Sequence, residues 1–315
     1  MASVGLLHAD LFQQHLTGPD HPEQPARLRA VLKRLATDGL SQQMAELAPI
    51  AATEAQLQRV HPAAYVQRVR EAAESGQSWV DSQDANLSSQ SEKVARHAAG
   101  AAMQAVDQVL GGHWQRAFVA ARPPGHHAEE SLAMGFCLFN NAVLAARHAQ
   151  AAHGLERVAI VDWDVHHGNG TQHILERDGS IFYGSLHQFP HYPGTGLATD
   201  RGFGDGEGAT LNCPMPPGTG DKHWRRAFER EMLPALEAFA PQLVIVSAGF
   251  DAHELDPLSE TDLHEESYAA FTRELLQATS ACAGGRMVSL LEGGYHLDAL
   301  ASSAAAHVGA MLEAP

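Results

Sequence analysis

Cysteines and basic residues are scarce in this sequence. Its 315 residues include only three cysteines, none of them in a Cys-x-x-Cys pair. No disulfide framework is therefore expected, and a reducing compartment is the simplest prediction. Lys and Arg together number 21 against 37 Asp and Glu, and the formal net charge is −16. Because sequence-independent nucleic-acid binding needs basic side chains that neutralise phosphates, no nucleic-acid partner is expected, whereas cationic substrates would be attracted.

Long hydrophobic runs and several catalytic signatures are absent as well. No apolar run is long enough to span a bilayer, and the N-terminal stretch lacks the basic region of a signal peptide. We therefore expect a cytoplasmic protein with no membrane partner. The sequence contains no His-Glu-x-x-His motif, no Gly-x-Ser-x-Gly motif and no Walker A loop, so the protein classes with those signatures are disfavoured.

Short apolar runs alternate with helical patterns along the chain. The four runs of strand length show no apolar–polar alternation, as expected for strands covered on both faces. Because strands and helices alternate, the sequence predicts an α/β fold with a parallel sheet between helices, in one large domain or two. Strands are expected at 117–120, 158–161, 243–246 and 287–291, helices at about 25–39, 91–110, 222–239 (capped by Asp221), 261–280 and 298–312, and loop at 189–220.

Polar clusters follow all four predicted strands. In open α/β sheets the site lies beyond the carboxyl ends of the strands, so these clusters predict one assembled active site. In the densest cluster, Asp162, Asp164 and His166 would point to one side if the strand geometry persists. Two buried carboxylates and an imidazole are costly unless a bound cation neutralises them. The clusters read Arg-Pro-Pro-Gly-His-His (122–127), Asp-Trp-Asp-Val-His-His-Gly-Asn-Gly (162–170), Ser-Ala-Gly-Phe-Asp (247–251) and Glu-Gly-Gly-Tyr (292–295).

Asp164, His166 and Asp251 are the candidate metal ligands. One imidazole nitrogen and two carboxylate oxygens suit zinc or another first-row divalent ion, and three protein ligands leave a position open for water or substrate. Zinc at such a site lowers the pKa of bound water to about 7 and polarises a carbonyl oxygen. Taken alone, Asp164-x-His166 also fits an ordinary polar turn. The carboxylate of Asp251, which follows another predicted strand, favours the metal site instead.

Two further motifs fit the chemistry of amide hydrolysis. His126 and His127 could supply a general base for water and an acid for the leaving amine. The hydroxyl of Tyr295 could donate a hydrogen bond to a developing oxyanion. Each motif in isolation also fits loop decoration or a packing residue, and its place at a strand end favours catalysis.

Five motifs in the same order resemble the zinc-dependent histone deacetylase family. The resemblance covers about residues 8–312 and is nearest to the class II branch and to the bacterial histone deacetylase-like amidohydrolases. It implies an arginase–deacetylase fold with an eight-stranded, mostly parallel sheet, in a single deacetylase domain over residues 1–315. The motifs lie at 122–128, 135–141, 162–172, 247–251 and 291–295, and the early stretch at 21–28 also fits.

The resemblance also divides the roles within the site. It implies that His127 is the main general base and acid, that His126 assists electrostatically and that Tyr295 binds the amide oxygen and then the oxyanion. Asp162 would orient His126 rather than bind zinc, which leaves zinc to Asp164, His166 and Asp251. A structural potassium ion would be bound by Asp162, by the main chains of Asp164, His166 and Leu186, and by Ser185.

The substrate tunnel is likewise expected from the resemblance. Its walls would be Phe136 and Tyr192, with Gly125 at its floor. Asp84 stands where relatives bind the amide N–H of the substrate, and Arg27 stands along an exit path for the acid product.

Two positions discriminate within the family. Asn169 stands where class I enzymes carry a second Asp, which indicates class II and a lower pKa for His127, because an amide stabilises an imidazolium less than a carboxylate does. Leu258 stands at the rim where acetylpolyamine-selective relatives have Glu, which favours acyl-lysine-like substrates.

The leading hypothesis is a zinc-dependent deacylase that hydrolyses N-acyl amides of lysine side chains or of small acylated amines. An acetylpolyamine amidohydrolase of the same family is the first alternative. A two-manganese ureohydrolase is disfavoured, because Asn169 and Ala252 stand where additional acids would help. A silent acyl-lysine-binding protein is disfavoured by the retained His pair and Tyr295. The preferred acyl group and a homo-oligomeric state are left open.

Overall fold

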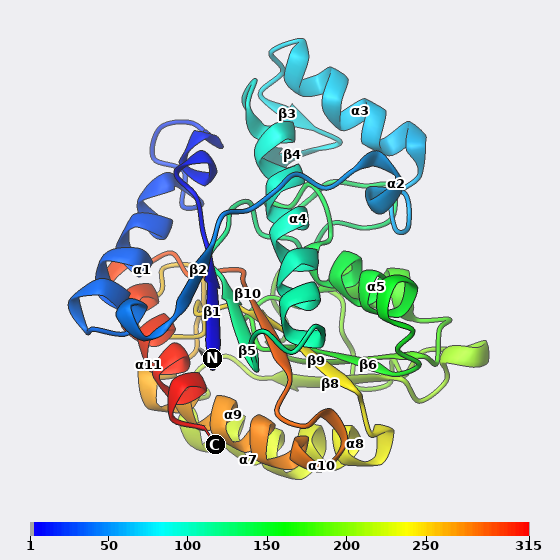
Figure 1. The fold of residues 1–315 in the computed structure, drawn as a ribbon, viewed down its shortest axis with the longest axis vertical. Helices are drawn as coiled ribbons and strands as arrows, with labels where there is room; N and C mark the ends of the chain where they lie inside the picture. Colours follow the sequence, from blue (N-terminus) through cyan, green and yellow to red (C-terminus); the bar gives the residue numbers. More distant parts are fainter. Residues whose placement is uncertain (1–2, 315) are drawn as a thin grey trace.

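An eight-stranded sheet forms the centre of the structure, a computed structural model that describes residues 3–314 (Figure 1). All of its neighbouring strands pair in parallel. The parallel α/β sheet predicted from the sequence is therefore confirmed. In spatial order the strands are β2 (Ala45–Leu47), β1 (Val4–Leu7), β5 (Arg116–Val119), β10 (Met287–Leu291), β9 (Leu243–Ala248), β6 (Val158–Asp162), β7 (Ile181–Gln188) and β8 (Thr210–Met215).

The four strands expected from their apolar runs are neighbours at the middle of this sheet. They are β5, β10, β9 and β6, and every residue in them is buried. Burial on both faces explains why their sequences are apolar throughout instead of alternating. Their carboxyl ends consequently lie side by side at one edge of the sheet.

Helices cover both faces of the sheet (Figure 1). On one face, α4 (Ser91–Leu110) packs on β5 and β10, and α5 (Asn141–His153) packs on β6 and β9. On the other side, α11 (Leu297–Glu313) lies between α1 (Pro25–Thr37) and α9 (Glu265–Ala278). The shorter elements are α2 (Glu54–Leu57), α3 (Ala63–Glu74), α6 (Asn169–Leu175), α7 (Asp221–Ala227), α8 (Leu233–Phe239), α10 (Ser280–Ala283) and an antiparallel pair, β3 (Trp79–Val80) with β4 (Ser82–Asn86).

Three expectations about the fold are wrong. The stretch 189–220 is not all loop, because β8 lies within it and pairs with β7. The single helix expected at 222–239 is interrupted by a π-helical turn at Phe228–Met232. Pro234 follows this turn and has no N–H to donate, so an uninterrupted α-helix is disfavoured there. Asp221 does not cap that helix, and its carboxylate instead accepts hydrogen bonds from the N–H of His264 and from Ser267.

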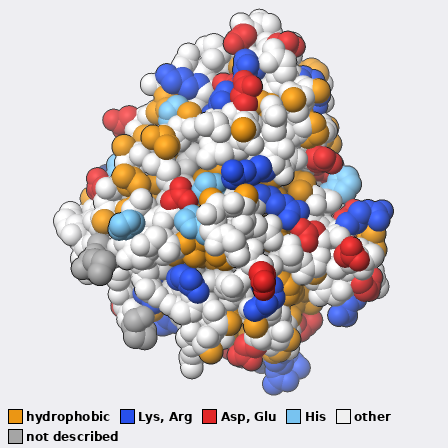
Figure 2. All heavy atoms as spheres, turned by 45° about the vertical axis from the view of Figure 1, so that its right-hand side comes forward, with side chains coloured by type: hydrophobic (Ala, Val, Ile, Leu, Met, Phe, Trp, Pro, Cys, Tyr) orange, Lys and Arg blue, Asp and Glu red, His pale blue; other side chains and the backbone are white. Residues whose placement is uncertain are grey.

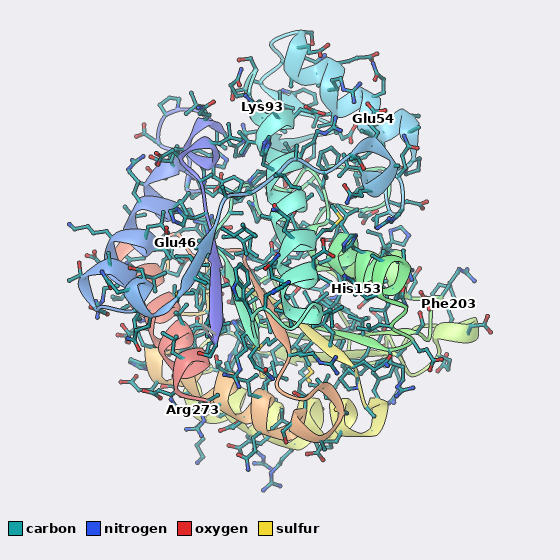
Figure 3. All side chains as sticks on the ribbon, in the orientation of Figure 1. Glu46, Glu54, Lys93, His153, Phe203 and Arg273 are labelled. Atoms are coloured by element: carbon teal, nitrogen blue, oxygen red, sulfur yellow. The ribbon has the colours of Figure 1, made fainter. Side chains whose placement is uncertain are left out.

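The surface is mixed in charge. Figure 2 shows basic and acidic side chains interspersed on the face that it presents, with hydrophobic side chains between them. Figure 3 shows side chains filling the space between sheet and helices, with Glu54, Lys93 and Arg273 at the outside of the molecule. Within residues 3–314, no helix combines the length and the apolar character needed to cross a membrane.

Candidate active site and metal centre

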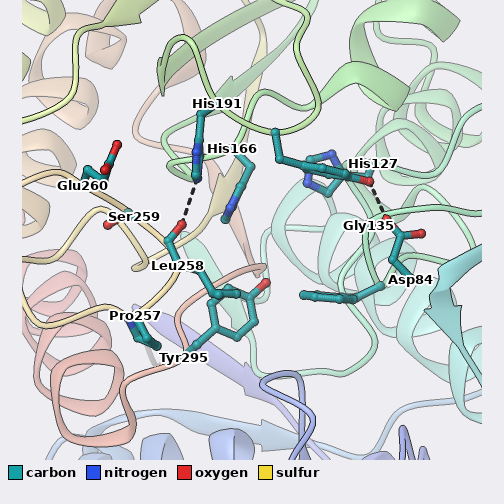
Figure 4. A pocket seen from close by; sticks show the side chains of 12 residues that line it. Asp84, His127, Gly135, His166, His191, Pro257, Leu258, Ser259, Glu260 and Tyr295 are labelled. Carbon is teal, nitrogen blue, oxygen red and sulfur yellow. Dashed lines mark hydrogen bonds between the residues drawn. The ribbon is translucent and has the colours of Figure 1, made fainter.

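The segments that follow the four central strands meet around a cavity of about 450 Å³. This position agrees with the general rule that sites in open α/β sheets lie beyond the carboxyl ends of the strands. Figure 4 shows His127, His166 and Tyr295 around the same space. The lining residues are Asp84, His127, Gly135, Phe136, His166, His191, Tyr192, Pro257, Leu258, Ser259, Glu260 and Tyr295.

Asp164, His166 and Asp251 form a buried cluster at the bottom of this cavity. His166 Nδ1 lies 3.1 Å from Asp164 Oδ1 and 3.2 Å from Asp251 Oδ2. A tetrahedral zinc ion bound at about 2.0–2.1 Å would hold its ligand atoms roughly 3.3 Å apart. The spacing and the chemistry of these donors therefore fit zinc.

Main-chain N–H groups fix both carboxylates of the cluster. Asp164 Oδ1 accepts from the N–H of His166 at 2.9 Å, and Asp164 Oδ2 accepts from Gly293 at 2.7 Å. Asp251 Oδ1 accepts from the N–H of Val165 at 2.9 Å. Gly293 has to be glycine here, because a Cβ atom would lie only 1.9 Å from Asp251 Oδ2. These contacts hold the carboxylates so that one ligand atom from each of the three residues lies within 4.8 Å of the other two.

The cluster attracts positive charge. Burial alone would lower the pKa of His166, but hydrogen bonds and charge interactions with Asp164 and Asp251 outweigh burial and raise its pKa to about 10. A divalent ion bound to the three groups would supply that positive charge and remove the cost of the buried carboxylates. Asp162 does not join this cluster, because β6 ends at Asp162 and the strand geometry does not continue through 164 and 166.

His126 and His127 lie next to each other beside the cluster, with ring centroids 4.0 Å apart. His126 Nδ1 lies 3.1 Å from Asp162 Oδ2, whereas His127 Nδ1 lies 2.8 Å from Asn169 Oδ1. Burial would lower the pKa of His126, but Asp164 and Asp162 outweigh it and raise the pKa to about 10. Burial lowers the pKa of His127, and repulsion from the neighbouring His126 lowers it further. These effects outweigh Asp164 and Asn169, so the pKa falls well below its usual value. The two rings therefore have opposite preferences for a proton.

Tyr295 faces the cavity from the loop after β10. Its N–H donates to Asp256 Oδ2 at 2.6 Å, and its ring lies under the guanidinium of Arg27 at 4.9 Å. Burial raises the pKa of the Tyr295 phenol well above 10, so that the hydroxyl keeps its proton and can donate it in a hydrogen bond.

Comparison with known proteins agrees with this arrangement. A family model described as the histone deacetylase domain matches residues 21–311. The chain belongs to the histone deacetylase family. The histone deacetylase-like amidohydrolase of Pseudomonas aeruginosa is 43% identical over 278 residues, which cover 87% of this chain and 72% of that protein. The polyamine deacetylase HDAC10 of Homo sapiens is 39% identical over 333 residues, which cover 100% of this chain and 49% of that protein.

A solved structure extends the likeness to the whole fold of this deacetylase family member. The crystal structure of the HDA15 HD domain superposes with a TM-score of 0.94 at 39% identity, over 99% of this chain and 89% of that chain. The arginase–deacetylase fold expected from the sequence motifs is therefore confirmed.

Four of the six substrate residues expected in this deacetylase line the cavity. They are Asp84, Phe136, Tyr192 and Leu258. The Tyr192 hydroxyl donates to Asp84 Oδ2 at 2.8 Å, and Phe136 meets Tyr295 edge to face at 5.8 Å between centroids. These contacts form aromatic walls that lead down to the metal ligands.

The other two, Gly125 and Arg27, are not among the lining residues. Arg27 is fully buried and donates to the carbonyl oxygens of Gly294 at 2.6 Å and Glu292 at 2.5 Å, and to Glu23 at 3.1 Å. It therefore supports the loop that carries Tyr295. The Gly125 N–H donates to Glu292 Oε2 at 2.6 Å, and a Cβ atom on Gly125 would crowd Asn141.

Some residues expected to bind potassium lie on the neighbouring strands β6 and β7. Asp162 and Ser185 are register partners on β6 and β7, and Leu186 follows on β7. Ser185 Oγ lies 2.9 Å from His187 Nδ1, and Asp162 Oδ2 also accepts from the Tyr183 hydroxyl at 3.2 Å.

Several residues of the deacetylase site were not foreseen from the sequence. Glu292 accepts from the N–H groups of Gly125 and His126, and His191 stacks on His166 with centroids 4.9 Å apart. Glu292 lies in a motif already noted at a strand end, which was a usable signal. His191 lies in a loop rich in Gly and Pro, where no periodic pattern marks it. Asp256, Glu129 and Glu260 were missed as well.

Proposed function

We propose that this protein is a zinc-dependent deacylase that hydrolyses N-acyl amides of lysine-like alkyl amines. The observation that carries the proposal is the convergence of three candidate metal donors, two histidines and the hydroxyl of Tyr295 around one cavity with aromatic walls. Membership of the histone deacetylase family supports the reaction class. Asn169 beside His127 supports the class II branch, and the pairing of Asp162 with Ser185 supports a structural potassium ion nearby.

Each group of the site has a separate role in the hydrolysis. Zinc held by Asp164, His166 and Asp251 would polarise the amide carbonyl and activate water. His127, whose Nδ1 is taken up by Asn169, presents Nε2 to take a proton from the attacking water and to pass it to the leaving amine. The Tyr295 hydroxyl donates a hydrogen bond to the oxyanion as charge develops.

His126 has a different part in the reaction. Its Nδ1 lies 3.1 Å from the carboxylate of Asp162, which favours a positive charge on the ring. A charged ring beside the reacting carbonyl stabilises negative charge on the oxyanion, without itself carrying the proton to the amine.

The rim supports an acylated amine as the substrate. Aromatic and aliphatic side chains form the walls, which suit an alkyl chain of the lysine type. Asp84 and Glu260 lie among the lining residues, and within the described chain no Lys or Arg does. This charge pattern also favours the second candidate, an acetylpolyamine amidohydrolase, and it agrees with the similarity to a polyamine deacetylase.

Tyr295→Phe tests the mechanism, because it removes only the hydroxyl. Turnover of an acetyl-lysine reporter should fall by about 10²–10³-fold, the usual cost of one oxyanion donor. Zinc content, measured by mass spectrometry, should stay at the parent value. The matched control is Tyr268→Phe, since the Tyr268 hydroxyl is buried without a hydrogen-bond partner among the described residues. Equal turnover in the Tyr295 variant and the parent would refute the assigned role.

A substrate screen separates the two candidate functions. Acetyl-lysine peptides, longer acyl-lysine peptides and acetylpolyamines would be compared by kcat/KM with the zinc-loaded protein. Preference for peptides supports the deacylase of lysine side chains, and preference for polyamines supports the alternative. A zinc-loaded protein that binds these ligands but turns over none of them would contradict both.

A further inference from the structure

Glu129 lies behind the proton-transfer side of the site and has no role so far. We propose that Glu129 is a positioning residue that fixes the orientation of the Asn169 amide, and thereby the ring nitrogen of His127 that faces the substrate. The inference rests on the proposed function in one respect: it takes His127 as the residue that transfers a proton from the attacking water to the leaving amine.

Glu129 is clamped between two residues of α6. Asn169 and His173 are four positions apart on this helix and therefore lie on the same face. Asn169 Nδ2 lies 3.0 Å from Glu129 Oε1, and His173 Nδ1 lies 2.9 Å from Glu129 Oε2. The Glu129 N–H donates to the carbonyl of Leu132 at 2.9 Å, which holds the turn from which the side chain extends. A continuous chain of hydrogen bonds thus runs from His127 through Asn169 and Glu129 to the exposed ring of His173.

The carboxylate determines the direction of this chain. An ionised carboxylate only accepts hydrogen bonds, whereas a primary amide has one donor end and one acceptor end. Glu129 therefore requires the NH₂ end of Asn169, which directs the Asn169 oxygen at His127 Nδ1, 2.8 Å away. His127 must then carry its proton on Nδ1, so that the lone pair of Nε2 faces the cavity.

The opposite orientation would disable the ring. If the NH₂ end of Asn169 faced His127, Nδ1 would have to accept and the proton would move to Nε2, where it would block the base. In the Ser-His-Asp triad, a comparable change of tautomer lowers kcat by about 10⁴-fold. Met134 Sδ lies 3.3 Å from Asn169 Nδ2 and favours the same orientation, but sulfur is a much weaker acceptor than a carboxylate.

Glu129 also acts on the strength of the hydrogen bond. Donation to a negative group polarises the amide, so its oxygen becomes a better acceptor for the His127 N–H. In this way a neutral Asn169 next to His127 is backed by a carboxylate one residue further away. Glu129 thus supplies, through Asn169, the negative charge that an Asp bonded directly to His127 would supply.

The first test replaces the Glu129 carboxylate, which only accepts hydrogen bonds, by an amide of nearly the same shape, which can also donate them. In Glu129→Gln the new amide can donate to Asn169 Oδ1, so both orientations of Asn169 become accessible. We expect kcat on an acetyl-lysine reporter to fall by about 2- to 10-fold, the range of one ordinary hydrogen bond, while KM stays the same. Glu130→Gln is the matched control, because the neighbouring Glu130 is exposed and has no side-chain partner among the described contacts.

The swapped pair Asn169→Asp with Glu129→Gln provides a rescue. Asp at 169 can only accept from His127, and Gln at 129 can donate to that carboxylate, so the required tautomer is restored. The double variant should be more active than Glu129→Gln alone. If Glu129 served only to stabilise the turn, the double variant would be no more active than the single one, and the inference would be wrong.

A spectroscopic readout keeps the inference independent of activity. Imidazole ¹⁵N shifts of the zinc-loaded protein distinguish protonated from unprotonated nitrogens, and His127 is assigned by its loss in His127→Gln. The parent should show a protonated Nδ1 and a bare Nε2 at His127, and Glu129→Gln should show a mixture. An unchanged tautomer in Glu129→Gln overturns the inference even if the protein is an active deacylase. An inactive parent with the expected shifts would instead count against the proposed function alone.

Discussion

The floor and the rim of the cavity are built in different ways. We call floor the buried layer beneath the cavity, in which His166 lines the cavity and the carboxylates accept from main-chain N–H groups; it consists of Asp162, Asp164, His166, Asp251 and Glu292, which follow or end strands. The rim includes Asp84, Tyr192, Leu258 and Glu260, which come from loops or from the small β3–β4 pair.

Contacts in the rim are few and join segments that are distant along the chain. Tyr192 reaches Asp84 through one hydroxyl, and His191 Nε2 lies 2.8 Å from the carbonyl of Leu258 (Figure 4). Glu260 is exposed, its carboxylate accepts from Gln188 Nε2 at 3.2 Å, and its N–H donates to Gln188 Oε1 at 2.9 Å. Because buried groups with several partners are costly to disturb and exposed contacts are not, the floor should control whether the reaction occurs and the rim which substrate is used.

The largest effect should come from the floor itself. Asp251→Asn keeps the shape but removes the negative charge of one ligand, and loss of even an outer partner of a metal site costs about 10–100-fold in affinity or activity. We expect the loss of activity to exceed that range and the zinc content to fall, both measured on the purified protein before and after added zinc. The control is Asp262→Asn on an exposed loop. Full zinc loading with normal turnover in Asp251→Asn would refute the view that the floor controls whether the reaction occurs.

The next largest effect concerns the free energy of unfolding and the buried ion pairs of Glu23. Glu23 is fully buried and pairs with Arg122 and Arg27, and Arg27 holds the loop of Tyr295. Glu23→Gln leaves both guanidinium charges uncompensated and should lower the free energy of unfolding by about 3–5 kcal/mol, measured by urea denaturation. Exposed Glu74→Gln is the control and should change it little.

The same variant makes a pH prediction for the free energy of unfolding. Burial would raise the pKa of Glu23, but the charge and hydrogen bonds of Arg122, together with His15 and Arg27, outweigh burial and lower the pKa from 4.5 to about 2. A carboxyl with a lowered pKa in the folded state stabilises the protein above its unfolded pKa and loses that contribution as the pH falls. The parent should therefore lose stability between pH 4.5 and about pH 2, and Glu23→Gln should lose less over that window. Identical pH profiles would contradict this assignment.

The smallest effect should come from the rim. Glu260→Gln removes an exposed charge, and exposed charge pairs contribute about 0.2–1 kcal/mol, so KM for an acylated amine with a second positive charge should rise by roughly 2- to 5-fold. KM for an uncharged analogue should stay constant, and the difference should shrink at high salt. An equal change for both substrates would show that Glu260 shapes the rim and does not select charge.

The contrast between floor and rim also limits what the sequence can predict. The four central strands were found because they are buried on both faces and uniformly apolar. β7 was missed although all eight of its residues are buried, because it contains Gly184, Ser185, His187 and Gln188 and lacks a continuous apolar run. β8 was missed because Pro214 interrupts its pattern. The strands β1 and β2 on the opposite side were not predicted either, so local composition indicated the middle of the sheet better than its two sides.

The site follows the same division. Asp164, His166 and Asp251 were paired from their positions at strand ends, and the structure brings them together. The contacts of Arg27 with Glu23 and with a carbonyl 265 positions away were not foreseen, and the exit path assigned to Arg27 stays a prediction. Glu129 was missed because its partner Asn169 is 40 positions distant and no local pattern links them. Contacts that form only in the folded chain carry no local sequence signal.

The place of β10 has a consequence for how the protein matures during synthesis. β10 (Met287–Leu291) lies between β5 and β9, although it is the last strand to be made. A nascent chain that ends before residue 287 therefore has an open gap at the centre of its sheet and lacks the glycine that braces Asp164. The cluster of Asp164, His166 and Asp251 can therefore take its final geometry only after nearly the whole domain has been synthesised.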